Sequence, residues 1–311
     1  MTQLHLVATA LVAVALTASA CGTGTRRETS LQDQVQVTGA FKARPTLRFK
    51  APLSIEKSES WVTQAGRGDR VGAASTVILQ LTITNGRTGK PAVSTLDKGQ
   101  RPLDIRLGNQ VFPSLAQALV GQRDHSRVVV ASTPEDAYGS NGAPQVGLEA
   151  DDPVLMVADI LSTDPTTVLT SPTGATGTPP ATAPRLVLAD GVPARFDFTG
   201  ARKPRKLVVI ALREGTGPVV ESPDRVAVDY LLQVWGAPEP VQETFSKEPT
   251  LISIGTSSGA IKAWDTALVG AKEGSRLLIL APPELAYGAT AQQDIPSGST
   301  LAFVVDVLGV G

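Results

Sequence analysis

Residues 261–303 decide the fold, and they read IKAWDTALVGAKEGSRLLILAPPELAYGATAQQDIPSGSTLAF. The apolar spacing predicts a short helix over residues 261–269, a strand over residues 276–280 and a closing apolar strand from Leu301. An Ala-Tyr-Gly corner and an Ile-Pro loop join the two strands. Four apolar or half-apolar side chains can converge from these separate elements: Trp264, Tyr287, Ile295 and Phe303. Because no nucleophile–base pair or metal-ligand cluster accompanies them, the stretch predicts a ring-lined binding cavity rather than a hydrolytic site.

An earlier part of the chain repeats this stretch. Short matches occur in the same order in both places: GRG at 66–68 with GTG at 215–217, ALVG at 118–121 and 267–270, SR at 126–127 and 275–276, PEDAYG at 134–139 with PELAYG at 283–288, and ADIL at 158–161 with VDVL at 305–308. The offset is 149 residues for the first four pairs (267 − 118, for example) and 147 for the last (305 − 158). A nearly constant offset over five matches indicates two copies of one domain.

A low-complexity segment separates the two copies. Residues 162–184 are rich in Thr, Pro, Ala and Gly, so they bury too little apolar surface to order themselves and are predicted to be an extended linker. The copies are therefore placed at residues 36–161 and 185–311. Strand patterns dominate both copies, and only residues 261–269 and their counterpart, 114–120, predict a helix. The expected fold class is α+β, with a sheet wrapped on one short helix in each copy.

The first 35 residues read as an export signal and a tether. Residues 4–20 form an apolar run that is too short to span a membrane comfortably, which is typical of a signal peptide over residues 1–20. The run ends in small residues directly before Cys21 and resembles a bacterial lipoprotein box. That resemblance implies cleavage before Cys21, lipidation of its sulfur and an exported protein anchored at the outer face of the cell membrane. Ordinary secretion is the alternative. Residues 21–35 are predicted to be a polar tether.

The composition excludes several classes of function. A net charge of −1 gives no reason to expect nucleic acid as a partner. Cys21 is the only cysteine, which excludes disulfides within the chain and thiolate metal cages. Outside the leader the only histidine is His125, so Ser-His and Cys-His nucleophilic sites and His-rich zinc sites are not expected. We expect no metal and no cofactor.

Residues 206–311 resemble the FKBP-type peptidyl-prolyl cis–trans isomerase family. The resemblance is carried by VDY at 228–230, IKAWDTAL at 261–268, PPELAYG at 282–288, Ile295-Pro296 and TLAF at 300–303. It implies two tandem domains of this type, each a curved antiparallel β-sheet wrapped round the short helix. It also implies that the catalytic pocket is formed by Trp264 as its floor with Tyr230, Tyr287 and Phe303 as walls. The implied substrate-binding residues are Val241, Gln242, Ile261, Ala286 and Ile295.

One position departs from the family pattern. Before the strand at Pro249 the family has a Phe-Asp pair whose ring and carboxylate line the pocket, and the nearest residues here are Val241-Gln242. The Gln242 amide can still form hydrogen bonds, but the negative charge is absent and valine is smaller than phenylalanine. The departure predicts reduced or altered activity.

The first copy lacks the rings of the second. Aligning the copies puts Leu115 opposite Trp264, Leu81 opposite Tyr230 and Met156 opposite Phe303. Because aliphatic side chains fill these positions in the first copy, we interpret the rings of the second copy as a pocket. The first copy is predicted to be a degenerate domain that acts as a spacer, a docking surface or a client-binding module. Tyr138, which matches Tyr287, is predicted to be a corner residue without a catalytic role.

The resemblance and the residues lead to one preferred hypothesis and two alternatives. The preferred function is a peptidyl-prolyl isomerase that assists the folding of exported proteins. Its partners would be proline-containing unfolded or exported polypeptides, macrolides of the kind this family binds, and the membrane through the Cys21 anchor. The first alternative is a non-catalytic client-binding protein or holdase chaperone. The second is a structural envelope lipoprotein without a ligand.

Overall fold

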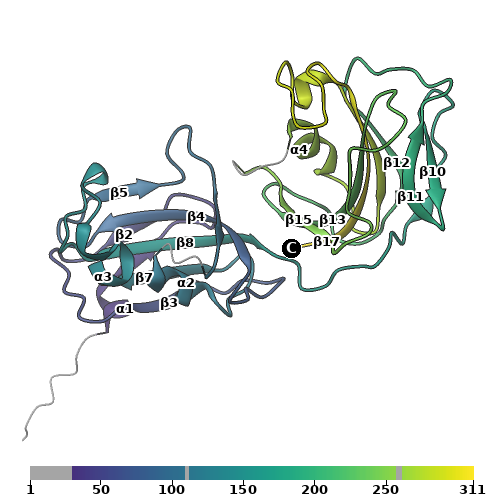
Figure 1. Cartoon of the computed structure of the whole chain (residues 1–311). Helices are drawn as coiled ribbons and strands as arrows, with labels where there is room; N and C mark the ends of the chain where they lie inside the picture. The colour runs from purple at the N-terminus through teal and green to yellow at the C-terminus, as the bar shows by residue number, and fades with distance from the viewer. Residues whose placement is uncertain (1–29, 109–111, 257–260) are drawn as a thin grey trace, which may run out of the picture.

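The computed structural model describes residues 30–108, 112–256 and 261–311. Figure 1 shows two β-sheet bodies, which are the two copies, joined by the segment between β8 and β9. The predicted signal peptide and Cys21 lie outside the described residues. Within the described ranges, the helices are too short and too polar to cross a membrane.

The first copy is a six-stranded antiparallel sheet with the strand order β3-β7-β8-β4-β5 and with β6 also paired to β4. Its elements are α1 (Leu31–Gln34), β1 (Gln36–Thr38), β2 (Thr46–Arg48), β3 (Glu59–Gln64), β4 (Thr76–Asn85), β5 (Pro91–Ser94), β6 (Leu103–Arg106), α2 (Pro113–Leu119), β7 (Arg127–Ser132), α3 (Pro134–Ala137), η1 (Gly139–Asn141), η2 (Pro144–Val146) and β8 (Val154–Thr163).

The second copy repeats this plan with the strand order β14-β13-β17-β16-β12-β9, and β15 pairs β13. Its elements are β9 (Ala175–Thr176), β10 (Arg185–Ala189), β11 (Val192–Asp197), β12 (Val208–Glu214), β13 (Arg225–Val234), β14 (Gln242–Glu243), β15 (Thr250–Ser253), α4 (Lys262–Leu268), β16 (Arg276–Ala281), η3 (Pro283–Leu285) and β17 (Leu301–Val310). The antiparallel sheets and single short core helices confirm the predicted fold class.

The strand registers of the two copies are equivalent. Phe303 on β17 lies opposite Leu232 on β13, and Met156 on β8 lies opposite Ile83 on β4. These pairs are related by the offsets read from the sequence, since 232 − 83 is 149 and 303 − 156 is 147. In the second copy, Ala263, Trp264, Ala267 and Leu268 of α4 face the sheet in one core cluster with Val228, Ile279 and Phe303. The helix therefore stands over the concave face, where it can support a cavity.

A steric constraint explains why the glycines of the GRG and GTG motifs are present in both copies. A Cβ on Gly66 would lie 2.0 Å from the Asp124 carbonyl oxygen, and one on Gly215 would lie 2.2 Å from that of Glu273. The amide of each glycine also donates a hydrogen bond to a serine hydroxyl, Ser126 or Ser275, over 2.9 Å. The backbones approach so closely that only glycine fits, which explains why these positions are identical in copies that differ elsewhere.

Both copies contain a buried arginine–aspartate pair on adjacent central strands. Arg127 on β7 lies opposite Asp159 on β8, with Nε–Oδ1 at 2.5 Å. Arg276 on β16 lies opposite Asp306 on β17, with Nε–Oδ1 at 2.6 Å. Burial raises the pKa of Asp306, an effect that the Arg276 guanidinium opposes. The pair thus belongs to the common framework and not to the pocket.

A two-stranded hairpin precedes the core sheet in each copy and extends the repeat. Gln36 pairs with Arg48 across β1 and β2, and Arg185 pairs with Asp197 across β10 and β11. Both residue pairs are separated by 149 positions (185 − 36 and 197 − 48). The second hairpin packs Phe196 on the outer face of its sheet, against Leu231, Leu278 and Val304.

Parts of the predicted linker and of the predicted tether are ordered. Residues 162–163 complete β8, and β9 pairs with β12 through Ala175 and Thr176, so the linker is partly ordered along the second copy. Backbone hydrogen bonds help to hold it, including one from Leu169 N to Leu308 O at 2.7 Å, and the Asp164 side chain pairs with Arg225. Within the predicted tether, α1 buries Leu31 and Val35 against the first copy.

Candidate functional site

A cavity of about 630 Å³ opens on the concave side of the second copy, between α4, β13, β15 and β17. Its lining includes the four rings of Tyr230, Trp264, Tyr287 and Phe303, and the aliphatic side chains of Leu232, Leu251, Ile252 and Ile261. Polar residues complete the wall: Gln242, Thr250, Ser253 and Arg225 from the second copy, and Thr76, Asp104 and Arg106 from the first. The cavity is large enough for a prolyl residue with its neighbours in a peptide.

The rings contact one another edge to face. The Tyr230 and Trp264 ring centroids are 5.0 Å apart with an interplanar angle of 86°, and those of Trp264 and Phe303 are 5.6 Å apart at 78°. Edge-to-face contacts are a favourable arrangement of aromatic rings and hold these rings in fixed relative orientations. Trp264 retains 6% of its exposure, so the indole forms the floor of the cavity with other rings upright beside it.

Three polar hydrogens of these rings are unused. In the described residues, the hydroxyls of Tyr230 and Tyr287 make no hydrogen bond, and the buried indole N–H of Trp264 has no acceptor. Burial, assisted by the nearby Tyr287, raises the pKa of Tyr230, so this phenol stays protonated at neutral pH. Since buried polar groups are normally hydrogen-bonded, the indole N–H is a donor available to a ligand, and the two half-exposed tyrosine hydroxyls lie beside it on the cavity wall.

The structure brings together six of the nine predicted site residues on the cavity wall: Tyr230, Gln242, Ile261, Trp264, Tyr287 and Phe303. The other three do not line it. Ile295 is 5% exposed within the core cluster, and Val241 and Ala286 pack against that cluster. Gln242, at the start of β14, lines the cavity, whereas Val241 directly before it packs against the core cluster that supports the rings.

Sequence reasoning missed the wall that the first copy supplies. Asp104 and Arg106 of β6 and Thr76 of β4 line the cavity of the second copy. No local pattern identifies them, because their role depends on how the two copies meet. The strand expected at Pro249 is β15, Thr250–Ser253.

The corresponding region of the first copy is filled. Leu81, Leu115 and Met156 are 2%, 1% and 0% exposed and belong to one core cluster. Tyr138 donates its hydroxyl to the backbone carbonyl of Glu149 at 2.9 Å and also contacts that of Asp152. Its counterpart, Tyr287, has a free hydroxyl. The structural role predicted for Tyr138 is confirmed.

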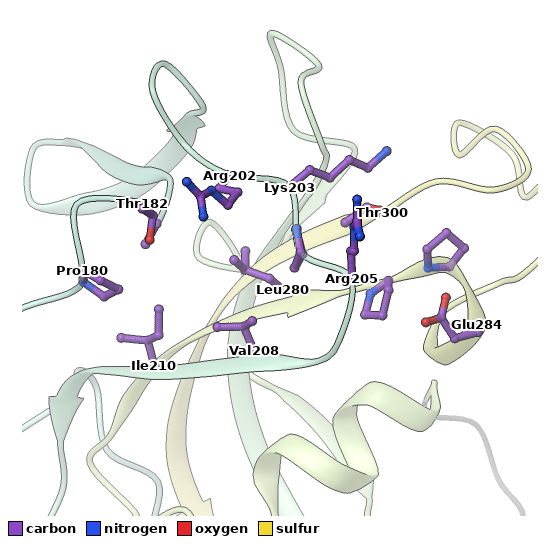
Figure 2. A pocket seen from close by; sticks show the side chains of 14 residues that line it. Pro180, Thr182, Arg202, Lys203, Arg205, Val208, Ile210, Leu280, Glu284 and Thr300 are labelled. Atoms are coloured by element: carbon purple, nitrogen blue, oxygen red, sulfur yellow. The ribbon is translucent and has the colours of Figure 1, made fainter.

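A second cavity lies on the outer side of the same sheet. It has a volume of about 1070 Å³, and Figure 2 shows the cationic side chains of Arg202, Lys203 and Arg205 beside an apolar floor that contains Val208 and Leu280. Its lining has no aromatic ring. The larger cavity therefore lacks the ring-lined surface of the smaller one, and we assign the candidate site to the smaller cavity.

Comparisons with known proteins agree with this assignment. The model of the FKBP-type peptidyl-prolyl cis–trans isomerase family matches residues 217–308, which contain the whole ring-lined wall. An FK506-binding protein of Streptomyces anulatus is 31% identical over 117 residues, which cover 37% of this chain and 94% of that protein. The isomerase FkpA of Escherichia coli K12 is 32% identical over 104 residues, 33% of this chain and 37% of FkpA.

A further relative and a solved structure also match the chain. Mouse FKBP2, a peptidyl-prolyl cis–trans isomerase, is 41% identical over 64 residues, 20% of this chain and 45% of that protein. The three FKBP domains of wheat FKBP73 match with 16% identity and a TM-score of 0.35, over 82% of this chain and 94% of that one. On the family match, the Streptomyces relative and the ring-lined cavity together, the chain belongs to the FKBP-type peptidyl-prolyl cis–trans isomerases.

Proposed function

We propose that the second copy isomerises Xaa-Pro bonds of unfolded, exported polypeptides by holding the prolyl ring over Trp264 and stabilising the twisted amide. The observation that carries the proposal is the cavity of about 630 Å³ with four rings on its wall and unused donors among them. The location outside the cytoplasm comes from the sequence of the leader.

The chemistry of the amide explains why such a cavity suffices. A planar peptide bond resists rotation by about 18–20 kcal/mol because the nitrogen lone pair is delocalised into the carbonyl group. In the twisted transition state this delocalisation is lost, so the amide is less polar and loses less when it leaves water. Apolar walls such as Trp264, Phe303 and Ile252 therefore favour the twisted form over the planar one, which is differential binding of the transition state.

The donors orient the substrate during rotation. The free Tyr287 hydroxyl can donate to the carbonyl oxygen that precedes the proline and hold that side still while the prolyl ring turns against the indole. Every bond of the substrate remains intact, so the reaction needs no nucleophile and no proton transfer. Positioning and an apolar environment are the whole of the proposed catalysis.

A prolyl-peptide assay tests the proposal on the chain. We expect acceleration of cis-to-trans conversion above the uncatalysed rate, and loss of that acceleration on adding tacrolimus or rapamycin. With Trp61 and Trp235 changed to Phe, the remaining indole of Trp264 should change its fluorescence as the macrolide binds. No acceleration and no fluorescence change would together exclude this pocket as the isomerase site.

Export and anchoring are tested separately. We propose that Cys21 carries the lipid anchor, on the strength of the small residues that precede it. Cells expressing the chain should incorporate labelled fatty acid into it, and Cys21→Ser should move the protein from the membrane fraction to the medium. Equal membrane retention of both forms would contradict the anchor.

Client holding without turnover is a second candidate, favoured by Gln242. This neutral amide lies on the cavity wall where the family pattern has a carboxylate. A chain that suppresses aggregation of an unfolded client, but leaves prolyl-limited refolding at the uncatalysed rate, would support holding. Gln242→Asp restores the charge, so a gain in kcat/KM in that variant would identify the amide as the cause of reduced activity.

A further inference from the structure

The two copies meet through equivalent edges. The hydroxyl of Ser253, at the end of β15, donates a hydrogen bond to Asp104 of β6, and these residues are 149 positions apart. The first residues of β4 and β13, Thr76 and Arg225, are also equivalent (225 − 76 = 149), and both bind the carboxylate of Asp164. Equivalent sheet edges of the two copies therefore face each other, as equivalent surfaces do in an isologous interface.

Buried polar contacts fix this junction. Arg225 is 7% exposed, its Nε lies 2.8 Å from Asp164 Oδ1, and its Nη1 donates to the Ser253 hydroxyl at 2.6 Å. The backbone amide of Arg225 donates to Ser162 Oγ at 2.6 Å. In Figure 1 the end of β8 reaches the junction beside β15 and the C-terminus. Because a buried guanidinium is costly to leave unpaired, the contacts with Asp164 and Ser253 stabilise this arrangement of the two copies.

The junction places one face of β6 in the wall of the cavity. Side chains alternate along a strand, so Asp104 and Arg106 share a face while Ile105 lies on the opposite one. Ile105 packs against the core of the first copy, and Asp104 and Arg106 line the cavity that contains Trp264. The degenerate copy thus completes the site of the copy that has the rings.

The charges on this wall differ in their availability. Asp164 is paired with Arg225, and Asp104 accepts the Ser253 hydrogen bond. Arg101 donates to the backbone carbonyl of Thr256 at 3.3 Å, near the same edge. Arg106 is exposed and forms no ion pair in the described residues. These three arginines and two aspartates, in the wall and beside it, carry a net positive charge, and within the described residues Arg106 has neither an ion pair nor a side-chain hydrogen bond.

We propose that β6 of the first copy is a wall of the substrate site and that the Arg106 guanidinium selects peptides with an aspartate or glutamate close to the proline. A guanidinium binds a carboxylate through two parallel hydrogen bonds, so the preference is for a carboxylate rather than for any polar group. This inference rests on the proposed isomerase site and deepens it, because it names the substrate class and gives the first copy a task.

Matched peptides test the proposal on the whole chain. Two series carry Glu, Gln or Lys at one position, either before or after the Xaa-Pro bond, and are otherwise identical. In at least one series kcat/KM should fall from Glu to Gln to Lys by about two- to fivefold per step, the range of a partly exposed ion pair. Arg106→Gln should level the series, and Arg106→Glu should invert it. Arg48→Gln, which removes an exposed charge of the first copy away from the cavity, should leave the series unchanged.

A separate measurement of peptide binding distinguishes failure of this inference from failure of the isomerase proposal. The affinities of the same peptides, labelled with a fluorophore, are measured by anisotropy. Turnover of all peptides with no charge preference would overturn the role of Arg106 and leave the isomerase standing. Binding that prefers Glu through Arg106, without any turnover, would uphold the wall and overturn catalysis. Absence of both binding and turnover overturns both, and a preference that survives Arg106→Gln overturns this inference.

Discussion

The two copies share a backbone and differ in what fills its concave face. In the second copy, Tyr230, Trp264 and Phe303 surround a cavity, whereas Leu81, Leu115 and Met156 are packed into core at the equivalent positions of the first. The strand registers, the close glycine and the buried arginine–aspartate pair are common to both. The comparison teaches that the framework residues of this domain are separable from its pocket residues, so a copy can lose the pocket and keep the fold.

Breaking the buried arginine–aspartate pair should have the largest effect, and the effect is on stability. Arg127 also donates to the carbonyls of Gly39, Ala40 and Ala43, whereas Arg276, besides its pairing with Asp306, lies over the ring of Phe245. Arg127→Met should therefore destabilise the first copy by about 3–5 kcal/mol, because it leaves a buried carboxylate unpaired. Arg276→Met should affect the second copy less. Hydrogen exchange of β8 and β17 measures each copy separately, and equal losses would show that the hairpin carbonyls contribute nothing.

The copies also differ in the acidic residue that lies against the tightly packed glycine, which is Asp124 beside Gly66 in the first copy and Glu273 beside Gly215 in the second. Burial, reinforced by the Asp69 carboxylate, raises the pKa of Asp124 to about 7. At the equivalent position Glu273 accepts a hydrogen bond from Val310 N at 3.3 Å. Between an unfolded pKa of 3.8 and the folded value of about 7, the folded first copy binds the extra proton. Its stability should therefore fall as pH rises through this window, by at most about 1.4 kcal/mol per pH unit, and level off above it.

Asp124→Asn isolates this contribution. The amide does not titrate, so the variant should lose that part of the pH dependence and gain stability relative to the parent above about pH 7. Thermal unfolding followed across this window measures the difference between the two proteins. If parent and variant keep parallel pH profiles, Asp124 does not hold a proton in the folded state.

Converting the pocket floor to its counterpart tests the comparison directly. Trp264→Leu copies Leu115 and removes the cavity floor on which we propose that the prolyl ring rests. A loss of about 2 kcal/mol of transition-state stabilisation corresponds to about a 30-fold lower kcat/KM. The matched control is Leu115→Met, a volume-conserving change in the first copy that should leave kcat/KM unaltered. An equal effect of both substitutions on activity would break the division between pocket and framework.

Substituting the tyrosine of each Ala-Tyr-Gly corner should have the smallest effects. We expect the change to lower activity in the second copy and stability in the first. Tyr287→Phe removes an unused donor, so it should lower kcat/KM by about 1 kcal/mol, roughly fivefold, without changing stability. Tyr138→Phe removes a donor to the Glu149 and Asp152 carbonyls, so it should destabilise the first copy by about 1–3 kcal/mol without changing activity. Activity and unfolding measured on both variants should show this reversal, and loss of activity in Tyr138→Phe would contradict it.

The sequence predicted the framework because close contacts restrict residue identity. Gly66 and Gly215 leave no space for a Cβ, so the motif and its offset survive and locate both copies. The helix predicted at residues 261–269 is α4, Lys262–Leu268, and the strand predicted at 276–280 is β16, Arg276–Ala281. Positions under such tight steric constraint can therefore be identified from a single sequence.

The hairpins and the cavity wall from the first copy could not be predicted from the sequence, because they depend on backbone pairing and on contacts between the copies. The hairpins repeat at the same offset but are held by strand hydrogen bonds that many side chains allow, so they share little sequence. Six of nine site residues could be named from the family resemblance, but Ile295 lies in the core and Arg106 reaches the cavity from a different copy. No pattern within either copy encodes that approach.

The short strand that the linker adds beside β12 also has a protective consequence. At the equivalent border of the first sheet, β3 pairs only with β7 in the described residues and carries exposed polar side chains, with Glu59 at its start. β12 alternates half-buried Val208 and Ile210 with exposed Val209, and would attract a foreign extended chain if left bare. The linker pairs with the Arg213–Glu214 end of this border, so cutting the linker should lengthen the unpaired edge of β12 and favour self-association.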